Sequence, residues 1–204
     1  AALLHQVGSV AKACRGIKDT QERLAVMSSM PLWFTQMVVD DRGFEEASGL
    51  LHAMNNRAPL TIRANTLKTS TEELVQHLAQ EKIQCDPCAF SPHGLRLRHH
   101  RNIRALYSYR KGLFEAQDEG SQIIAQLVAP PPKGKVLDLC AGAGGKTLAL
   151  AALMENRGEI IATDIDPRRL ARLKPRLRRS GATNIRLHPW EKKLPKGWRG
   201  RVDR

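Results

Sequence analysis

A strand-like segment that runs directly into a glycine-rich turn is the feature that most constrains this chain. Residues 136–139 are mostly strand formers, the turn holds Gly142, Gly144 and Gly145, and residues 146–154 have a helical pattern. Glycines at the end of a strand leave backbone N–H groups uncovered and let a ligand approach the main chain closely. The sequence therefore predicts a strand–turn–helix unit that cradles a phosphate or a cofactor.

Three known glycine turns compete for this segment, and single residues decide among them. A P-loop requires a glycine where Cys140 stands, although Gly145-Lys146-Thr147 fits its end. A dinucleotide fingerprint requires a third glycine where Thr147 stands. The remaining pattern, D-x-x-x-G-x-G-G after a strand, is typical of the S-adenosylmethionine (SAM) turn of Rossmann-like methyltransferases. A nucleotide hydrolase that uses Lys146 and Thr147 stays open as an alternative.

An acidic residue at the end of the next strand supports the SAM turn. Residues 159–164 have the pattern of a strand, and Asp164 follows Gly142 by 22 residues. Folds of this kind place the acid that holds the ribose hydroxyls about 20 residues after the first glycine. An ordinary βαβ unit, whose glycines only permit a tight turn, is the alternative, and the strand, the helix and Asp164 together favour the ligand site.

Four segments, in order, resemble the RNA cytosine-C5 methyltransferases, most closely the bacterial 16S rRNA enzymes. Residues 138–147 resemble the family signature D-L-C-A-A-P-G-G-K-T, with Gly142 in place of an alanine and Ala143 in place of the proline. The other three segments are residues 58–68, 117–122 and 164–170. Without the proline ring φ is less fixed at Ala143, so we expect a slightly looser turn that still binds cofactor.

The resemblance implies an α/β chain with three parts. Residues 1–57 would be N-terminal helices, residues 58–119 a small α+β RNA-contacting module, and residues 120–204 the first, incomplete part of a Rossmann-like SAM-dependent methyltransferase domain. Residues 201–204 resemble the entry to the fourth strand of that domain.

Local patterns place the elements within these parts. Strands are expected at residues 60–67, near 89–90, and at 94–98, 112–116 and 184–188, and Ser70 or Thr71 can cap a helix.

Pro175 should kink the basic helix 167–179, because proline lacks the N–H that a helix interior needs. Apolar residues at helical spacing predict core-facing stripes before residue 57. These are Leu24, Val26, Met27, Met30, Trp33, Met37, Val38, Phe44, Ala47, Leu50, Leu51 and Met54.

The resemblance also implies a cofactor site on the glycine turn and the next strand. Backbone groups of residues 140–145 would surround the methionine and ribose parts of SAM, with Lys146 beside them lining the active site. Asp164 would accept the ribose hydroxyls, and Arg169 would steady Asp164 or meet RNA phosphate. Glu191 is a weak substitute for the carboxylate that usually meets the adenine. The predicted cofactor residues are Cys140, Ala141, Gly142, Ala143, Gly144, Gly145, Lys146, Asp164 and Arg169.

The charge of the chain favours a polyanionic partner. The net charge is +13, and residues 165–204 hold fourteen Lys and Arg against three acids. Each neutralised phosphate releases counterions, although a solvated basic helix face gives the same pattern without a ligand. Together with the resemblance, the charge predicts RNA as partner, rRNA first and tRNA second. The predicted RNA contacts are Arg63, Lys68, Arg168, Arg172 and Arg176.

The reaction that the resemblance implies needs cysteines that these residues do not supply. In the family a cysteine thiolate adds to C6 of cytosine so that C5 can accept the methyl group of SAM, and a second cysteine helps to release the product. The corresponding D-x-P-C and T-C motifs do not occur in the 204 residues, and Cys140 lies within the SAM turn. We therefore expect an N-terminal portion of the enzyme, inactive alone, with both cysteines after Arg204.

Two functions from other classes stay open. One is a catalytically inactive RNA-binding or assembly factor on a methyltransferase fold, which the missing cysteine motifs favour. The other is a SAM-dependent enzyme that acts on protein or a small molecule, which would not need the basic C-terminal stretch.

Cysteine use and hydropathy limit what else the chain can be. Cys85 and Cys88 form a CxxC, but no second ligand pair follows at zinc spacing, so no metal is expected. Four cysteines in 204 residues are too few for a disulfide scaffold. No apolar stretch reaches the ~18 residues of a membrane helix. We expect a cytoplasmic monomer without a membrane partner.

Overall fold

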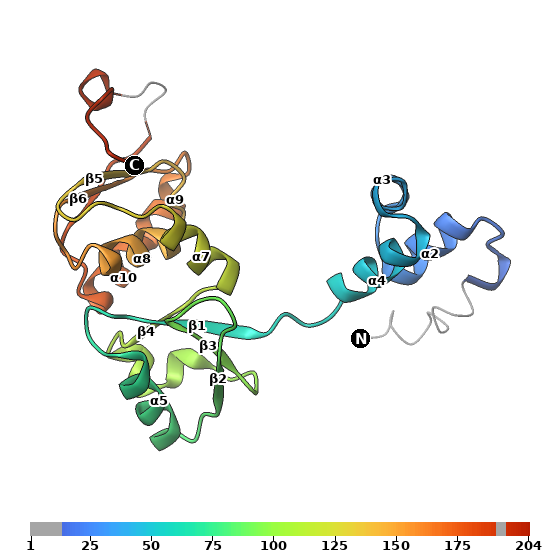
Figure 1. The fold of residues 1–204 in the computed structure, drawn as a ribbon, viewed down its shortest axis with the longest axis horizontal. Coiled ribbons are helices and arrows are strands. Elements are labelled where there is room, and N and C mark those ends of the chain that lie inside the picture. Colours follow the sequence, from blue (N-terminus) through green and yellow to red (C-terminus); the bar gives the residue numbers. More distant parts are fainter. Residues whose placement is uncertain (1–13, 191–194) are drawn as a thin grey trace. The chain divides into compact units, whose positions relative to one another are not determined.

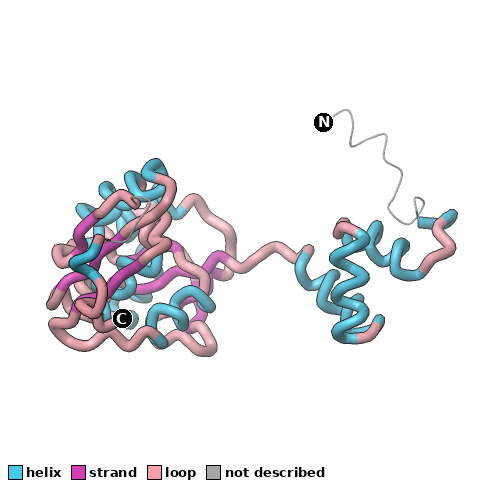
Figure 2. Tube along the Cα trace, turned by 90° about the horizontal axis from the view of Figure 1, so that it is seen from above, coloured by secondary structure: helices cyan, strands magenta, loops and turns pink. Residues whose placement is uncertain are grey.

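The computed structural model describes residues 14–190 and 195–204, and the chain divides after Ala58 into two units. Figure 1 shows helices alone before this division, and both sheets after it. Figure 2 shows the same distribution by type of element, with strands confined to the second unit. Glu191, the weak candidate for the adenine carboxylate, lies outside the described residues.

Three helices form the described core of the N-terminal unit. They are α2 (Thr20–Ser28), α3 (Leu32–Arg42) and α4 (Phe44–Met54), after the short 3-10 turn η1 (Cys14–Gly16). Their core consists of Leu24, Val38, Ala47 and Leu51, with Met30, Phe34 and Val39 packed against it. Within the described residues of this unit, few elements pack against each helix, so each helix buries only a narrow stripe.

The prediction that all the apolar stripe residues lie in the core is wrong. Trp33 is 67% exposed and Met37 is 53% exposed. Both lie about 100° or more around α3 from the buried Val38, since successive helical residues turn by that angle. The exposed members of the stripes are Val26, Met27, Trp33, Met37, Phe44, Leu50 and Met54.

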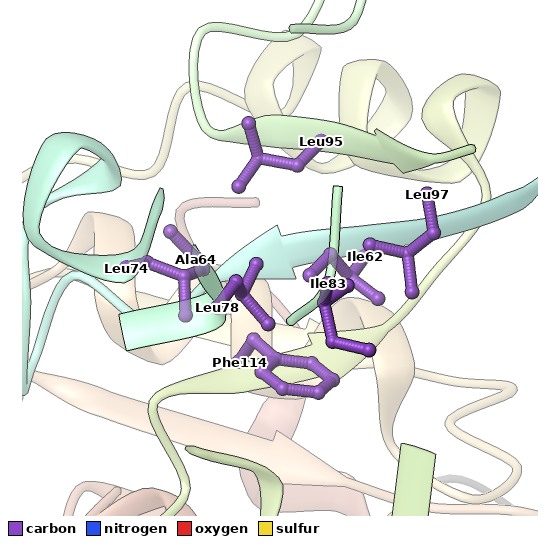
Figure 3. Packing of buried hydrophobic residues seen from close by; sticks show 8 residues of the cluster. All are labelled: Ile62, Ala64, Leu74, Leu78, Ile83, Leu95, Leu97 and Phe114. Atoms are coloured by element: carbon purple, nitrogen blue, oxygen red, sulfur yellow. The ribbon is translucent and has the colours of Figure 1, made fainter. Parts of the chain in front are cut away.

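A four-stranded antiparallel sheet begins the second unit. Its strands are β1 (Leu60–Ala64), β2 (Cys85–Pro87), β3 (Gly94–Leu97) and β4 (Phe114–Ala116), in the order β2-β3-β1-β4. Helix α5 (Thr71–Gln80), the turn η2 (Ile103–Ala105) and the short helix α6 (Tyr107–Arg110) complete the module. Figure 3 shows the eight side chains of its core, which are Ile62, Ala64, Leu74, Leu78, Ile83, Leu95, Leu97 and Phe114.

The strand expected near residues 89–90 lies earlier in the chain, at β2. Phe90 is 77% exposed, and its N–H donates to Glu119 Oε1 at 2.6 Å instead of to a neighbouring strand. The N–H of Ser91 donates to the same carboxylate oxygen at 3.1 Å. A side chain distant in sequence thus satisfies the backbone donors that a strand would have used.

Helix α5 begins where the sequence predicts. Ser70 Oγ accepts the Glu73 N–H at 3.1 Å, and Glu73 Oε2 accepts the Ser70 N–H at 2.9 Å, which is a capping box. We expect Ser70→Ala to lower the free energy of unfolding by about 1 kcal/mol, because the cap loses its acceptor. Urea denaturation checks this value. Ser70→Asp, which keeps a side-chain acceptor, should stay near the wild type, and equal losses in both variants would contradict the assignment.

Three parallel strands form the second sheet. They are β5 (Lys135–Asp138), β6 (Glu159–Ala162) and β7 (Ile185–Leu187), in the order β5-β6-β7. Helices α7 (Glu119–Leu127) and α8 (Gly145–Leu153) are in contact, and α8 forms the crossover from β5 to β6. The last three residues of β6 are all buried, as expected of a central parallel strand. The structure thus confirms the three strands predicted for this part.

The end of the chain lies along the free edge of β5. The Leu137 N–H donates to the Arg204 carbonyl at 2.9 Å, and the Asp203 N–H donates to the Lys135 carbonyl at 2.7 Å. This segment therefore occupies the edge position at which a fourth strand would pair. A 3-10 turn, η3 (Lys196–Trp198), precedes it.

The predicted kink in the basic helix is a break. Two helices, α9 (Pro167–Ala171) and α10 (Leu173–Ser180), replace one, and they meet at Arg172. Pro175 has no N–H for the Ala171 carbonyl, and its ring crowds that carbonyl. The break places Pro175 in the first turn of α10, where a helix needs no such bond.

Candidate functional site

The predicted cofactor residues of the glycine turn form one loop at the carboxyl edge of the parallel sheet, between β5 and α8. The Gly144 N–H donates to the Ala141 carbonyl at 2.8 Å, which closes a tight turn. Gly142 has φ +54° and Gly144 has φ +84°, a region that favours glycine. The Ala141 N–H donates to the Thr163 carbonyl at 2.9 Å, which ties the loop to the end of β6.

Asp164 joins this loop directly. Its Oδ2 accepts the Gly142 N–H at 2.7 Å, and its Oδ1 accepts the Asp166 N–H at 2.9 Å. The Asp166 N–H, then the Gly142 N–H and the charge of Arg169, lower the pKa of Asp164 despite its burial. The structure thus brings together Gly142 and Asp164, which the sequence analysis paired, and Asp164 stays ionised at neutral pH.

Asp138, at the end of β5, is a second carboxylate at the same edge of the sheet. Its Oδ2 accepts the Thr147 hydroxyl at 2.7 Å. Burial raises the pKa of Asp138, and the Thr147 hydrogen bond and the charge of Lys146 only partly offset this effect. Sequence reasoning treated Asp138 only as the first letter of a signature. Two carboxylates with opposite pKa shifts at one edge are a pattern found at functional sites.

A cavity of about 210 Å³ opens beside the glycine turn. It lies between the start of α7 and the turn, so the segment 117–122 contributes to one wall. The lining residues are Gln117, Asp118, Ser121, Cys140, Ala141, Gly145 and Lys146. The cavity therefore brings four of the predicted cofactor residues together with a second segment of the resemblance. Arg169 lies outside this lining, and it acts on the site through its charge beside Asp164.

Arg63, predicted to contact RNA, lies inside the protein. It is 5% exposed, and its Nε donates to Gln117 Oε1 at 2.8 Å. Burial is the main cause that lowers the pKa of Arg63 to about 10. The prediction fails for a physical reason: this guanidinium is bound within the module, so it presents no surface to a phosphate.

Two more predicted RNA contacts have partners within the chain. Arg176 donates to Glu115 Oε2 at 2.8 Å and to the Ala143 carbonyl at 2.6 Å, and its side chain is 20% exposed. Lys68 is exposed, but its Nζ donates to the carbonyls of Lys111 and Arg179. The prediction that Arg176 contacts RNA is therefore corrected, because its guanidinium is already paired with the buried carboxylate of Glu115. Arg168 and Arg172 are exposed on α9 and at its end, as an RNA contact requires.

Sequence reasoning missed Glu115. Its side chain is 2% exposed and forms ion pairs with Arg176 and Arg179. The available signal was one acid among apolar neighbours in the predicted strand 112–116, where a charged residue needs a buried partner.

Cys85 and Cys88 show no metal-site geometry. Within residues 14–190 and 195–204, no three His, Cys, Asp or Glu side chains are placed to hold a metal ion. Burial raises the pKa of both thiols, so neither is activated as a thiolate. In the same part of the chain, no helix has the length and apolar character needed to cross a membrane.

Two family descriptions match the chain over most of its length. Residues 30–104 match the ferredoxin-like domain of the RsmF/B-like methyltransferases, and residues 125–204 match the 16S rRNA methyltransferase RsmB/F. The chain belongs to this RsmB/F methyltransferase family. The resemblance noted in the sequence is thereby confirmed, and so is the fold class of a methyltransferase domain preceded by a small α+β module.

Individual relatives agree with this assignment. A probable ribosomal RNA small subunit methyltransferase B of Synechocystis sp. is 34% identical over 84% of this chain and 39% of its own length. A human 28S rRNA (cytosine(4447)-C(5))-methyltransferase is 31% identical over 85% of this chain and 22% of its own. The crystal structure of a methyltransferase homologue from Pyrococcus horikoshii has a TM-score of 0.77 at 29% identity, covering 84% of this chain and 56% of that one. The chain thus spans well under half of these two curated relatives.

Proposed function

We propose that this chain carries the SAM-binding edge and an RNA-docking surface of an rRNA cytosine-C5 methyltransferase. The observation that carries the proposal is the bond between the Asp164 carboxylate and the Gly142 N–H, because it joins the glycine turn to the acid at the end of the next strand. The rRNA relatives and the basic surface of α9 and α10 support RNA as the substrate class.

The residues of the site have separate tasks in this proposal. SAM, when bound, supplies an electrophilic methyl group on a sulfonium. Asp164 is ionised and accepts the two ribose hydroxyls, while the turn around Gly142 lets the ligand approach the backbone closely. Lys146 lines the cavity beside the turn and adds positive charge near the site of transfer. Asp138 fixes Thr147, and with it the first turn of α8.

The covalent step requires a thiolate that we assign to sequence beyond this chain. Such a thiolate adds to C6 of cytosine, C5 then takes the methyl group, and loss of the C5 proton with cleavage of the C–S bond restores the aromatic ring. Cys140 lies in the cofactor turn, and Cys85 and Cys88 have raised pKa values. None of these three thiols therefore suits the role.

Analysis of rRNA from a strain without the gene tests the enzyme. We expect one rRNA cytosine to lose its 5-methyl group, detected by bisulfite sequencing and by nucleoside mass spectrometry, and to regain it when the gene is restored. A second candidate is an RNA-binding assembly factor without methyltransferase activity, since the basic surface of α9 and α10 would serve it equally well. That factor predicts unchanged methylation with impaired ribosomal subunit assembly.

Binding to RNA should depend on the exposed arginines of the basic helices. We expect Arg168→Ala and Arg172→Ala each to weaken RNA binding. Each should also make the plot of log association constant against log salt concentration less steep by about 0.7 to 0.9, because that is the contribution of one phosphate contact to the slope. Filter binding or fluorescence anisotropy at several salt concentrations measures both effects. Arg157→Ala, which removes an exposed arginine paired with Glu155 elsewhere in this unit, is the matched control and should leave the slope unchanged.

A further inference from the structure

The cofactor turn has a contact from α10 that no motif predicts. Arg176 Nη1 donates to the carbonyl of Ala143 at 2.6 Å. Ala143 stands between Gly142 and Gly144, which both have positive φ, a region that glycine adopts at no steric cost. Alanine has no ring to restrict φ. The Ala143–Gly144 peptide is thus held twice: from within the turn by the Gly144 N–H bond to the Ala141 carbonyl, and from outside it by the Arg176 guanidinium.

The other side of the Arg176 guanidinium is anchored in the small sheet. Its Nε and Nη2 both donate to Glu115 Oε2, at 3.1 Å and 2.8 Å. Glu115 lies on β4 and is 2% exposed, so its position is set by the packing of the antiparallel sheet. Arg176 therefore bridges a buried acid of the antiparallel sheet to the glycine turn at the edge of the parallel sheet.

Arg179 shares the anchor but not the loop. It forms an ion pair with Glu115 Oε1, and its guanidinium lies 3.8 Å from the centroid of the Tyr109 ring. Its hydrogen bonds and ring contact do not include residues of the turn. Arg179 thus belongs to the same buried ion cluster. An Arg179→Ala variant would weaken this cluster and leave the contact between Arg176 and the Ala143 carbonyl in place.

We propose that Arg176 is a positioning residue for the cofactor turn: held by Glu115, it keeps the Ala143 peptide in the conformation that receives SAM. The inference rests on the proposed function for its ligand, and on the contacts of Glu115, Arg176 and Ala143 for its geometry. The proposal makes the affinity for SAM depend on Glu115. This carboxylate belongs to the small module and reaches the cofactor turn only through Arg176.

Hydrogen–deuterium exchange without cofactor, followed by calorimetric titration with SAM, tests the proposal on the full chain. The variants are Arg176→Ala, Arg179→Ala and Arg178→Ala, and the last removes an exposed arginine of the same helix as a control. We expect faster exchange over residues 139–147 and about tenfold weaker SAM binding in Arg176→Ala, the usual effect of losing a charge-assisted hydrogen bond. Arg179→Ala and Arg178→Ala should leave exchange in the turn near the wild type.

The proposal is overturned if Arg176→Ala leaves exchange in the turn unchanged, or if Arg179→Ala raises it equally. If Arg176→Ala does not fold, as judged by thermal unfolding, Arg176→Lys replaces it, because lysine keeps the charge but has one nitrogen in place of the three that contact Glu115 and Ala143. Wild-type protein that binds no SAM would refute the proposed function, while the exchange experiment would still decide the role of Arg176.

Discussion

Asp164→Asn is expected to lower the affinity for SAM by about 10- to 100-fold, the effect of removing one charged hydrogen-bond acceptor. The side chain keeps its size, so the loss reports charge and acceptor capacity. The carboxylate already holds the Gly142 and Asp166 N–H groups. An asparagine can accept from only one of these groups, so the ribose would meet a neutral and less ordered partner. Isothermal titration calorimetry at pH 7 measures the change.

The matched control for this variant is Asp166→Asn. Asp166 caps α9 through the Arg168 N–H at 2.8 Å, and asparagine caps a helix as well as aspartate does. The Asp166→Asn variant should therefore bind SAM with an affinity within about twofold of the wild type. A twofold change is far smaller than the tenfold change in Kd that corresponds to about 1.4 kcal/mol of binding free energy. Equal affinities for Asp164→Asn and the wild type would remove Asp164 from the cofactor site.

The difference in stability between the wild type and Asp164→Asn should also depend on pH in a defined direction. The pKa of Asp164 is lowered from its ordinary value of 3.8, so the ionised form stabilises the fold. This stabilisation is fully present above the unfolded pKa and is lost as the pH falls through the folded pKa. The difference in free energy of unfolding between the wild type and Asp164→Asn should therefore be constant near neutrality and shrink in acid.

Gly144→Ala is expected to lower the free energy of unfolding by about 2 to 5 kcal/mol. A left-handed conformation costs a residue with a Cβ about 1 to 2 kcal/mol, and Gly144 has φ +84°. The added Cβ would overlap Leu173 Cδ1 and come within 2.9 Å of Cγ. Leu173 is fully buried, so it cannot move aside, and overpacking costs about 1 to 3 kcal/mol more. Denaturation in urea measures the loss.

Gly145→Ala provides the comparison one residue later. A Cβ there meets nothing closer than Gln117 Nε2 at 3.9 Å, and the residue begins α8. Its stability should equal or slightly exceed that of the wild type, because alanine is the better helix former. A similar loss in both variants would mean that any change in the turn destabilises the fold, and that packing against Leu173 is not the cause.

The parts of this protein that were predictable rest on interactions between residues close in sequence. The Ser70 capping box and the turn from Ala141 to Gly144 each close within four residues. Pro175 predicted a kink because it lacks the N–H of a helical bond, and the structure has a break at Arg172. Asp164 was found at longer range because the length of one crossover helix fixes its spacing from Gly142.

Charged residues were the least predictable, because their roles depend on partners far away in the chain. Glu115 and Arg176 are separated by 61 residues, and Arg63 and Gln117 by 54. In the sequence, Arg63 and Arg176 are indistinguishable from the exposed Arg168 and Arg172, so all four were assigned to RNA. The same difficulty affects Trp33. Its spacing in the helix predicts a core position, but in the structure its side chain is exposed.

The sequence by itself determined the βα unit, its glycine turn, the acid on the next strand and the family. These depend on backbone conformation and spacing, which are local properties of the chain. Only the tertiary structure decided which arginines face solvent, where Glu115 finds its partners, and that Arg176 reaches the Ala143 carbonyl. Burial and ion pairing arise when segments distant in the sequence pack together, and no short stretch of sequence contains that information.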